Sequence, residues 1–120
     1  MEKRIVIIED DRDILELLTI IFTQDGYHVS PFSTGKTAAF IGKLAPDIIL
    51  LDINIIGYER TGDQICSELK ALMLTSKTPV MLLSAEKNLE QLAKACQSDA
   101  FMAKPFDIDL LLAKARHLAA

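Results

Sequence analysis

The sequence predicts an α/β protein built on a parallel sheet that helices cover on both faces. Five short apolar runs alternate with five longer segments of helical period along the 120 residues. Such alternation is typical of strand-helix-strand units joined by right-handed crossovers. Half of the residues are hydrophobic, which suffices for the core of a chain of ordinary single-domain length. We therefore expect one domain over residues 1–120.

The apolar runs are the expected strands. They cover residues 5–8, 27–32, 48–51, 80–83 and 100–103. The first, third and fourth runs are wholly apolar, which is typical of central strands buried on both faces. Ser30 and Pro31 interrupt the second run, and proline is confined to edge strands because it cannot donate to a central ladder. The second run is therefore expected at an edge.

Apolar stripes of helical period predict five helices between and after these strands. The first stripe consists of Ile14, Leu15, Leu18, Ile21 and Phe22, and the others lie around residues 38–41, 65–72, 89–95 and 110–113. Gly26 follows the first stripe where a helix-ending glycine is favoured. We expect the first helix to end there.

Composition excludes several classes of protein. The net charge is −4 and the longest basic run is the pair Lys3 and Arg4, so we expect no direct contact of this domain with nucleic acid. Cys66 and Cys96 lack the Cys/His spacing of a metal site, and we expect small, buried side chains of a reducing compartment, with a metal or redox role as the alternative. No apolar segment approaches a signal peptide or the ~18 residues of a membrane span. The expected location is the cytoplasm.

Polar side chains follow four of the expected strands. In the stretch RIVIIEDDRDI, for example, three carboxylates come directly after the first apolar run. The full set is Glu9, Asp10, Asp11, Asp52, Ser84 and Lys104. Each alone would most often be a helix cap, a turn former or a solvated charge. The carboxyl ends of parallel strands meet at one rim, however, and ligands of such sheets bind there. Together these residues indicate a site.

The chemistry of this set points to phosphoryl transfer. Carboxylates without His or Cys prefer a hard cation, and an incompletely enclosed acidic site suits Mg²⁺, which keeps waters and accepts a phosphate oxygen. Asp52 at the end of the middle strand is a suitable nucleophile toward phosphorus. Lys104 and Ser84 could hold the other phosphoryl oxygens, so that positioning and charge neutralisation do most of the catalysis.

The motifs IIEDD, PDIILLDIN, LLSAE and AFMAKPF resemble, in this order, the receiver domains of two-component response regulators. The resemblance covers essentially the whole chain. It implies a doubly wound, flavodoxin-like sheet of strand order 2-1-3-4-5 with five helices. It also implies a phosphorelay module, not an enzyme, that accepts a phosphoryl group from a sensor histidine kinase or a phosphotransfer protein and then contacts other proteins.

The resemblance assigns a role to each residue of the rim. The implied transfer residues are Asp52 as phosphoacceptor, Lys104 as the phosphate-binding lysine and Ser84 as the hydroxyl that follows the phosphoryl group. The implied Mg²⁺ ligands are Asp10, Asp52, Asn54 through its backbone carbonyl and Glu9 through a water. Pro105 is implied to follow a cis bond that aims Lys104 inward. Asp11 is an extra carboxylate, either a solvated helix start or a group acting through water.

Further positions are implied to control lifetime and output. Asn54 and Glu86 stand where receivers tune the access of the hydrolytic water, unless they are simply two solvated loop residues. Phe101 stands at the switch aromatic and would turn inward as Ser84 moves; the alternative is a permanently buried core ring. The implied output surface is the face of the fourth helix, fifth strand and fifth helix, which would contact a downstream protein and would also allow a homodimer.

The sequence departs from the family pattern in two places. Ile56 stands where proline is usual, and Gly62 lies ten positions beyond Asp52 instead of the usual eight, so the intervening loop has about two extra residues and nothing from 55–61 can be transferred. Gln97 replaces the glycine that usually ends the fourth helix, which predicts a different cap.

Two other functions compete with the signalling module. A metal-dependent hydrolase with an aspartyl intermediate would need an acid/base carboxylate two residues beyond its nucleophile, but that position is Asn54. A degenerate receiver that acts only as a scaffold would be expected to have lost some of Asp10, Asp52, Ser84 and Lys104. The residues alone do not decide between a stand-alone regulator and a fragment of a longer protein.

Overall fold

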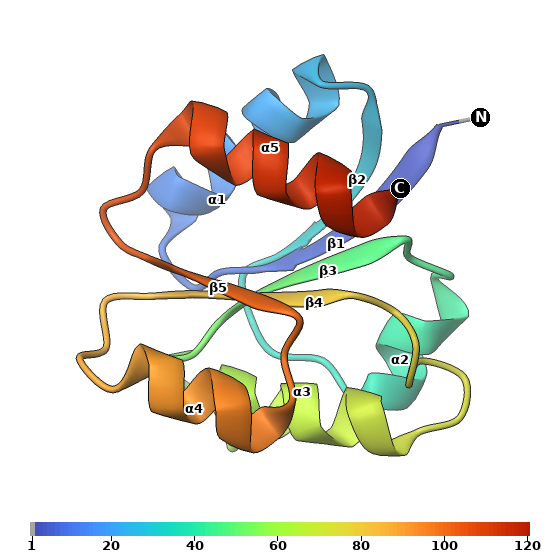
Figure 1. Cartoon of the computed structure of the whole chain (residues 1–120), viewed down its shortest axis with the longest axis vertical. Coiled ribbons are helices and arrows are strands. Elements are labelled where there is room, and N and C mark those ends of the chain that lie inside the picture. Colours follow the sequence, from blue (N-terminus) through green and yellow to red (C-terminus); the bar gives the residue numbers. More distant parts are fainter. Residues whose placement is uncertain (1) are drawn as a thin grey trace.

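The computed structural model describes residues 2–120 and contains one five-stranded parallel sheet (Figure 1). The strands are β1 (Lys3–Ile8), β2 (Tyr27–Phe32), β3 (Ile48–Asp52), β4 (Val80–Ser84) and β5 (Ala100–Ala103). The helices are α1 (Arg12–Gln24), α2 (Ala38–Lys43), α3 (Gly62–Ala71), α4 (Leu89–Cys96) and α5 (Ile108–Ala119). The strand order is β2-β1-β3-β4-β5 with every pair parallel, so the predicted class, order and number of helices are confirmed.

The helices form a layer on each face of the sheet. Helices α1 and α5 cover one face, and α2, α3 and α4 cover the other (Figure 1). Alternate side chains of β1 serve the two cores because successive strand residues point to opposite faces: Ile5 and Ile7 pack on the α1/α5 side, and Val6 and Ile8 on the other. The central strands therefore need apolar residues at every position.

Helix α1 begins and ends at the residues that the sequence indicates. The Asp11 carboxylate accepts hydrogen bonds from the backbone N–H groups of Asp13 (3.0 Å) and Ile14 (3.1 Å). Asp11 is thus the N-cap of α1, which supports the first of its two interpretations and satisfies donors that a helix start leaves free. At the other end, Gly26 has a φ of +95°, as a glycine after a helix commonly does.

Gln97 takes the left-handed conformation that glycine would supply at the end of α4. Its φ is 63° and its ψ is 33°. The next residue, Ser98, donates its backbone N–H to the Ala93 carbonyl at 3.0 Å, which closes the last turn. The predicted difference in the cap therefore lies in the residue type, since the backbone follows the usual left-handed geometry.

The two cysteines are buried where α3 packs against α4. The Cys66 thiol donates to the Cys96 carbonyl at 3.4 Å, and both side chains are free thiols. Burial raises the pKa of the Cys66 thiol, which makes it a poor nucleophile. The expectation of small, buried residues is confirmed.

None of the helices within residues 2–120 has the length and apolar character needed to span a membrane.

Gly62 lets the start of α3 approach the end of β3. Its backbone N–H donates to the Ile53 carbonyl at 2.8 Å. A Cβ atom at this position would lie 1.9 Å from the Asp52 carbonyl oxygen, well inside van der Waals contact. The glycine is therefore required by close backbone approach, and the two extra residues of the loop are accommodated before it.

We expect Gly62→Ala to lower the free energy of unfolding by about 2 kcal/mol, because the methyl group must push the Asp52 backbone away. Urea denaturation monitored by circular dichroism would measure the change. Ser67→Ala, at an exposed position of the same helix, is the control and should remain near the parent value. A Gly62→Ala protein as stable as the parent would show that the two backbones separate without cost.

Candidate functional site

The carboxyl ends of β1 and β3 bring three carboxylates together. Oxygens of Glu9, Asp10 and Asp52 all lie within 4.8 Å of one another. Glu9 and Asp52 are buried, with 1% and 6% of their surface exposed, while Asp10 is half-buried at the mouth. The expected convergence of these residues is confirmed.

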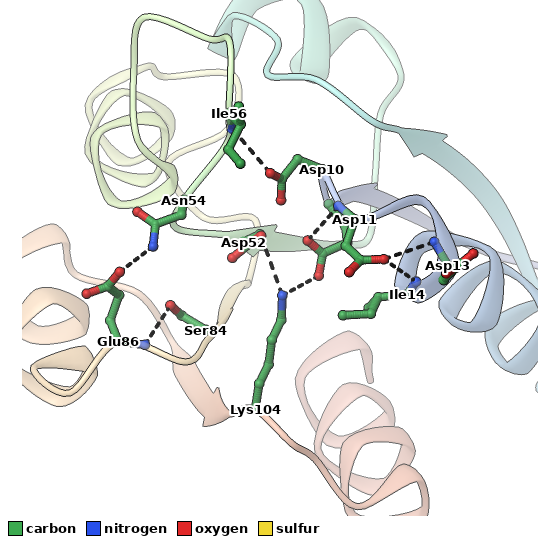
Figure 2. Close-up of polar contacts among 11 residues, drawn as sticks. Asp10, Asp11, Asp13, Ile14, Asp52, Asn54, Ile56, Ser84, Glu86 and Lys104 are labelled. Carbon is green, nitrogen blue, oxygen red and sulfur yellow. Dashed lines mark hydrogen bonds and ion pairs between the residues drawn. The ribbon is translucent and has the colours of Figure 1, made fainter.

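Lys104 crosses from the end of β5 into this cluster (Figure 2). Its ammonium group donates to Glu9 Oε1 and lies 3.4 Å from Asp52 Oδ2. Burial alone would lower the pKa of Lys104, but the adjacent Glu9 and Asp52 raise it, so the lysine remains charged. The Lys104–Pro105 bond is cis, as expected. The lysine thus neutralises part of the acidic cluster.

The titration of the carboxylates reflects how crowded they are. Burial, together with Glu9 and Asp10, raises the pKa of Asp52 to about 8 against the opposing effect of Lys104. Burial works in the same direction on Asp10, but hydrogen bonds involving Asp52 and the backbone of Ile56 lower its pKa. Burial and the neighbouring carboxylates therefore favour the protonated form of Asp52, and a divalent cation would displace this proton.

The donor set of this cluster fits Mg²⁺. Its three residues offer only carboxylate oxygens, and the half-buried Asp10 leaves one side open, so that an ion bound there could keep waters. Nitrogen and sulfur ligands, which would favour a transition metal, are absent from this cluster. The oxygen-only set agrees with the expectation from the sequence.

Ser84, Asn54 and Glu86 lie together beside the cluster. Ser84 ends β4 with 1% of its surface exposed, and its hydroxyl oxygen accepts the backbone N–H of Glu86 at 3.1 Å. The Asn54 side-chain amide donates to Glu86 Oε1, which joins the loops that follow β3 and β4 (Figure 2). Asn54 and Glu86 are therefore hydrogen-bonded to each other at the exposed surface of these loops. The lifetime role and the alternative of two solvated loop residues both stay predictions.

The loop from 55 to 61 contributes a contact that the sequence did not predict. The backbone N–H of Ile56 donates to Asp10 Oδ2 at 3.3 Å, while its side chain is 84% exposed. The Tyr58 ring lies against Gly35, where a Cβ atom would come within 2.1 Å of the ring. The only sequence signal was the greater length of the loop.

Phe101 lies on the edge strand β5, away from the cluster. Its ring is 37% exposed, so it is not a buried core aromatic in this structure. The adjacent depression is lined by residues of α4, β5 and α5, among them Ala93, Lys94 and Lys114. The ring thus faces the surface expected to carry the output.

A family model described as "Response regulator receiver domain" matches residues 5–116. The chain belongs to this family. Receiver domains accept phosphoryl groups from histidine kinases and bind Mg²⁺ at an acidic pocket. This chain has an acidic cluster of Glu9, Asp10 and Asp52. The interpretation of the motifs is therefore confirmed at the level of the family.

Curated relatives are longer than this chain. RpaA of Synechocystis, a DNA-binding dual master transcriptional regulator, is 33% identical over 118 residues, which cover 96% of this chain and 48% of RpaA. The transcriptional regulatory protein KdpE of Staphylococcus aureus is 32% identical over 119 residues, or 97% of this chain and 49% of KdpE. The chain spans about half the length of these relatives.

Solved receivers share the fold over nearly their whole length. The chemotaxis protein CheY4 of Vibrio cholerae superposes with a TM-score of 0.87 at 21% identity and covers 98% of this chain and 99% of its own. The BeF₃-activated receiver domain of DrrB, an OmpR/PhoB homologue of Thermotoga maritima, has a TM-score of 0.81 at 27% identity. The match covers 98% of this chain and 97% of the DrrB receiver domain. These likenesses agree with the predicted flavodoxin-like topology.

Proposed function

We propose that the chain accepts a phosphoryl group on Asp52 in a Mg²⁺-dependent reaction and signals through protein contacts that depend on this modification. The donor is a sensor histidine kinase or a phosphotransfer protein. The observation that carries the proposal is the ammonium of Lys104, which lies 3.4 Å from Asp52 within a cluster of three carboxylates. Such a site can neutralise the charge of an incoming phosphoryl group.

The residues of the site divide the work of the transfer. A carboxylate oxygen of Asp52 forms the new bond to phosphorus while the bond from phosphorus to the donor's imidazole nitrogen breaks. Lys104 binds one phosphoryl oxygen, and the Ser84 hydroxyl is the nearby neutral donor for another. The residues that would hold the metal are Asp10, Asp52, Asn54 through its backbone carbonyl and Glu9 through a water. Mg²⁺ would supply charge neutralisation and orientation.

The direct test is chemical phosphorylation of the protein. With Mg²⁺ and acetyl phosphate, intact-mass analysis should show one added phosphoryl group that is lost in base. Asp52→Ala and the parent protein in excess EDTA should gain none, whereas Asp13→Ala, at an exposed position of α1, should react like the parent. Equal labelling of Asp52→Ala and the parent would refute the assignment.

Several broader parts of the proposal rest on the same site. We propose that residues 1–120 act as one receiver unit in the cytoplasm. We also propose that they are not an enzyme, because a hydrolase would need a carboxylate where Asn54 stands, and the Asn54 amide instead donates a hydrogen bond to Glu86. Direct contact with nucleic acid is not proposed for these residues, although the relative RpaA is named as a DNA-binding protein. A filter-binding assay with duplex DNA would detect such contact.

The pair Asn54 and Glu86 is proposed to set the lifetime of the phosphorylated state. The two side chains are hydrogen-bonded to each other in the loops that follow β3 and β4, and this shared place beside Ser84 supports a role in guiding a hydrolytic water. Replacing both with leucine should slow dephosphorylation at least severalfold by excluding that water. The decay of the phosphorylated mass in Mg²⁺ buffer would be followed over time, with Glu90→Leu on the exposed side of α4 as control. An unchanged decay rate would remove the pair from this role.

The output is proposed to pass from Ser84 to Phe101 and the face formed by α4, β5 and α5. The partly exposed ring can turn inward if Ser84 moves toward a phosphoryl group, which would remodel this face for a downstream protein or a second copy of the chain. Comparing amide exchange of β5 in free and beryllofluoride-bound protein would test it, since beryllofluoride stands in for the phosphoryl group. Identical protection in both states would contradict the switch.

A further inference from the structure

We propose that the backbone N–H of Ile56 is a positioning group for the metal site, which holds the Asp10 carboxylate in the orientation that binds the ion. The inference rests on the Mg²⁺ site proposed above. It assigns a purpose to the longer loop between β3 and α3, in which Ile56 stands where the family usually has proline, a residue without a backbone N–H.

The Asp10 carboxylate lies between the loop that contains Ile56 and the other two carboxylates of the cluster. Oδ2 accepts the Ile56 N–H at 3.3 Å, and a carboxylate oxygen of Asp10 lies within 4.8 Å of oxygens of Glu9 and Asp52. Figure 2 shows Ile56 on one side of Asp10 and the cluster on the other. One oxygen is thus fixed by the loop, which leaves the other free to face the ion.

The loop is built to hold this amide still. Ile55 to Tyr58 form a turn in which the Tyr58 N–H donates to the Ile55 carbonyl at 3.2 Å, and Gly57 at the third position has a φ of +84°, as a type II turn requires. Ile55 is buried, and the Tyr58 ring packs over Gly35. Both ends of the turn are therefore anchored, although the Ile56 side chain itself lies in solvent.

The turn also provides a clean way to remove the bond. Ile56 is the second residue of the turn, and proline is favoured at that position of a type II turn because its φ is already suitable. Ile56→Pro should keep the turn and delete only the N–H, and it loses little packing because the side chain is 84% exposed. Ile56→Val keeps the N–H and is the matched control.

Calorimetric titration with MgCl₂ tests the proposal without any phosphodonor. Groups that orient a metal ligand typically contribute a factor of ten or more to affinity, so Ile56→Pro should bind Mg²⁺ roughly tenfold more weakly than the parent, and Ile56→Val should match the parent. Urea denaturation in EDTA should give the same midpoint for all three proteins. Equal or tighter binding by Ile56→Pro would overturn the inference while leaving the proposed function intact. Absence of binding by the parent protein would overturn both.

Amide hydrogen exchange supplies a second, independent measurement. If the bond to Asp10 persists in the metal-bound state, the Ile56 amide should stay protected, or become more protected, when Mg²⁺ is added. Faster exchange on addition of Mg²⁺ would mean that the ion competes with the loop for Asp10. That result would overturn the positioning role.

Discussion

Lys104→Met should lower the free energy of unfolding of the metal-free protein by about 3–5 kcal/mol, the usual cost of removing one partner from a buried ion pair. Glu9 is only 1% exposed, and its carboxylate accepts from the Lys104 ammonium. Without the lysine, a charged Glu9 would remain in the interior beside Asp52. Urea denaturation in EDTA at pH 7 would measure the loss.

A double variant distinguishes the loss of the pair from a loss of packing. Glu9→Gln combined with Lys104→Met removes both charges and should recover much of the stability, because the buried charge that lacks a partner is gone. Lys114→Met, outside this cluster on α5, is the control for the substitution itself. If the double variant is less stable than Lys104→Met, the ammonium stabilises the fold through contacts other than the pair with Glu9.

The metal-free protein should lose stability as the pH rises from 5 to 8. Asp52 has a pKa of about 8 in the folded chain and an ordinary value of 3.8, so between these values the folded state binds a proton that the unfolded state has released. The free energy of unfolding then falls by up to about 1.4 kcal/mol per pH unit from this group. The stabilisation is complete below pH 4 and is lost as the pH passes 8.

Mg²⁺ should reverse much of this trend, because the ion replaces the proton on Asp52 and binds more tightly as the pH rises. Urea denaturation at pH 5, 6, 7 and 8, with EDTA or with saturating MgCl₂, would show the two slopes. Asp52→Asn cannot titrate and should flatten the slope in EDTA. A parent protein with the same flat profile as Asp52→Asn would mean that the carboxyl group of Asp52 is already ionised at pH 5.

The sequence was informative wherever a local pattern and burial act together. Each apolar run became a strand within two residues of its expected ends. In β1, β3 and β4 the reason is that burial on both faces leaves little choice of residue type. The rim residues Glu9, Asp10 and Asp52 were found because charges at the end of a buried strand have no packing explanation. For Asp11 the sequence left a solvated helix start and a group acting through water as alternatives, and the structure shows the N-cap of α1.

The sequence could not predict contacts made by the backbone or between distant loops. The Ile56 N–H donates to Asp10, but every residue except proline carries such a donor. The identity of the side chain therefore gives no indication of this hydrogen bond. The Asn54–Glu86 bond joins residues 32 positions apart, and its geometry depends on how two loops lie in space. The course of the longer loop likewise depends on Tyr58 meeting Gly35, a contact between segments that neither strand pattern nor helix pattern specifies.

The left-handed conformation of Gln97 should lower the free energy needed to open the last turn of α4. A non-glycine residue in this conformation costs about 1 kcal/mol, and this cost is released when the last turn of α4 opens while the rest of the fold stays intact. Local opening should therefore begin at this helix, beside the depression that contains Phe101. The face proposed to meet partners thus borders a segment that can rearrange at less cost than its neighbours, and faster amide exchange at Gln97 and Ser98 in the parent than in Gln97→Gly would report it.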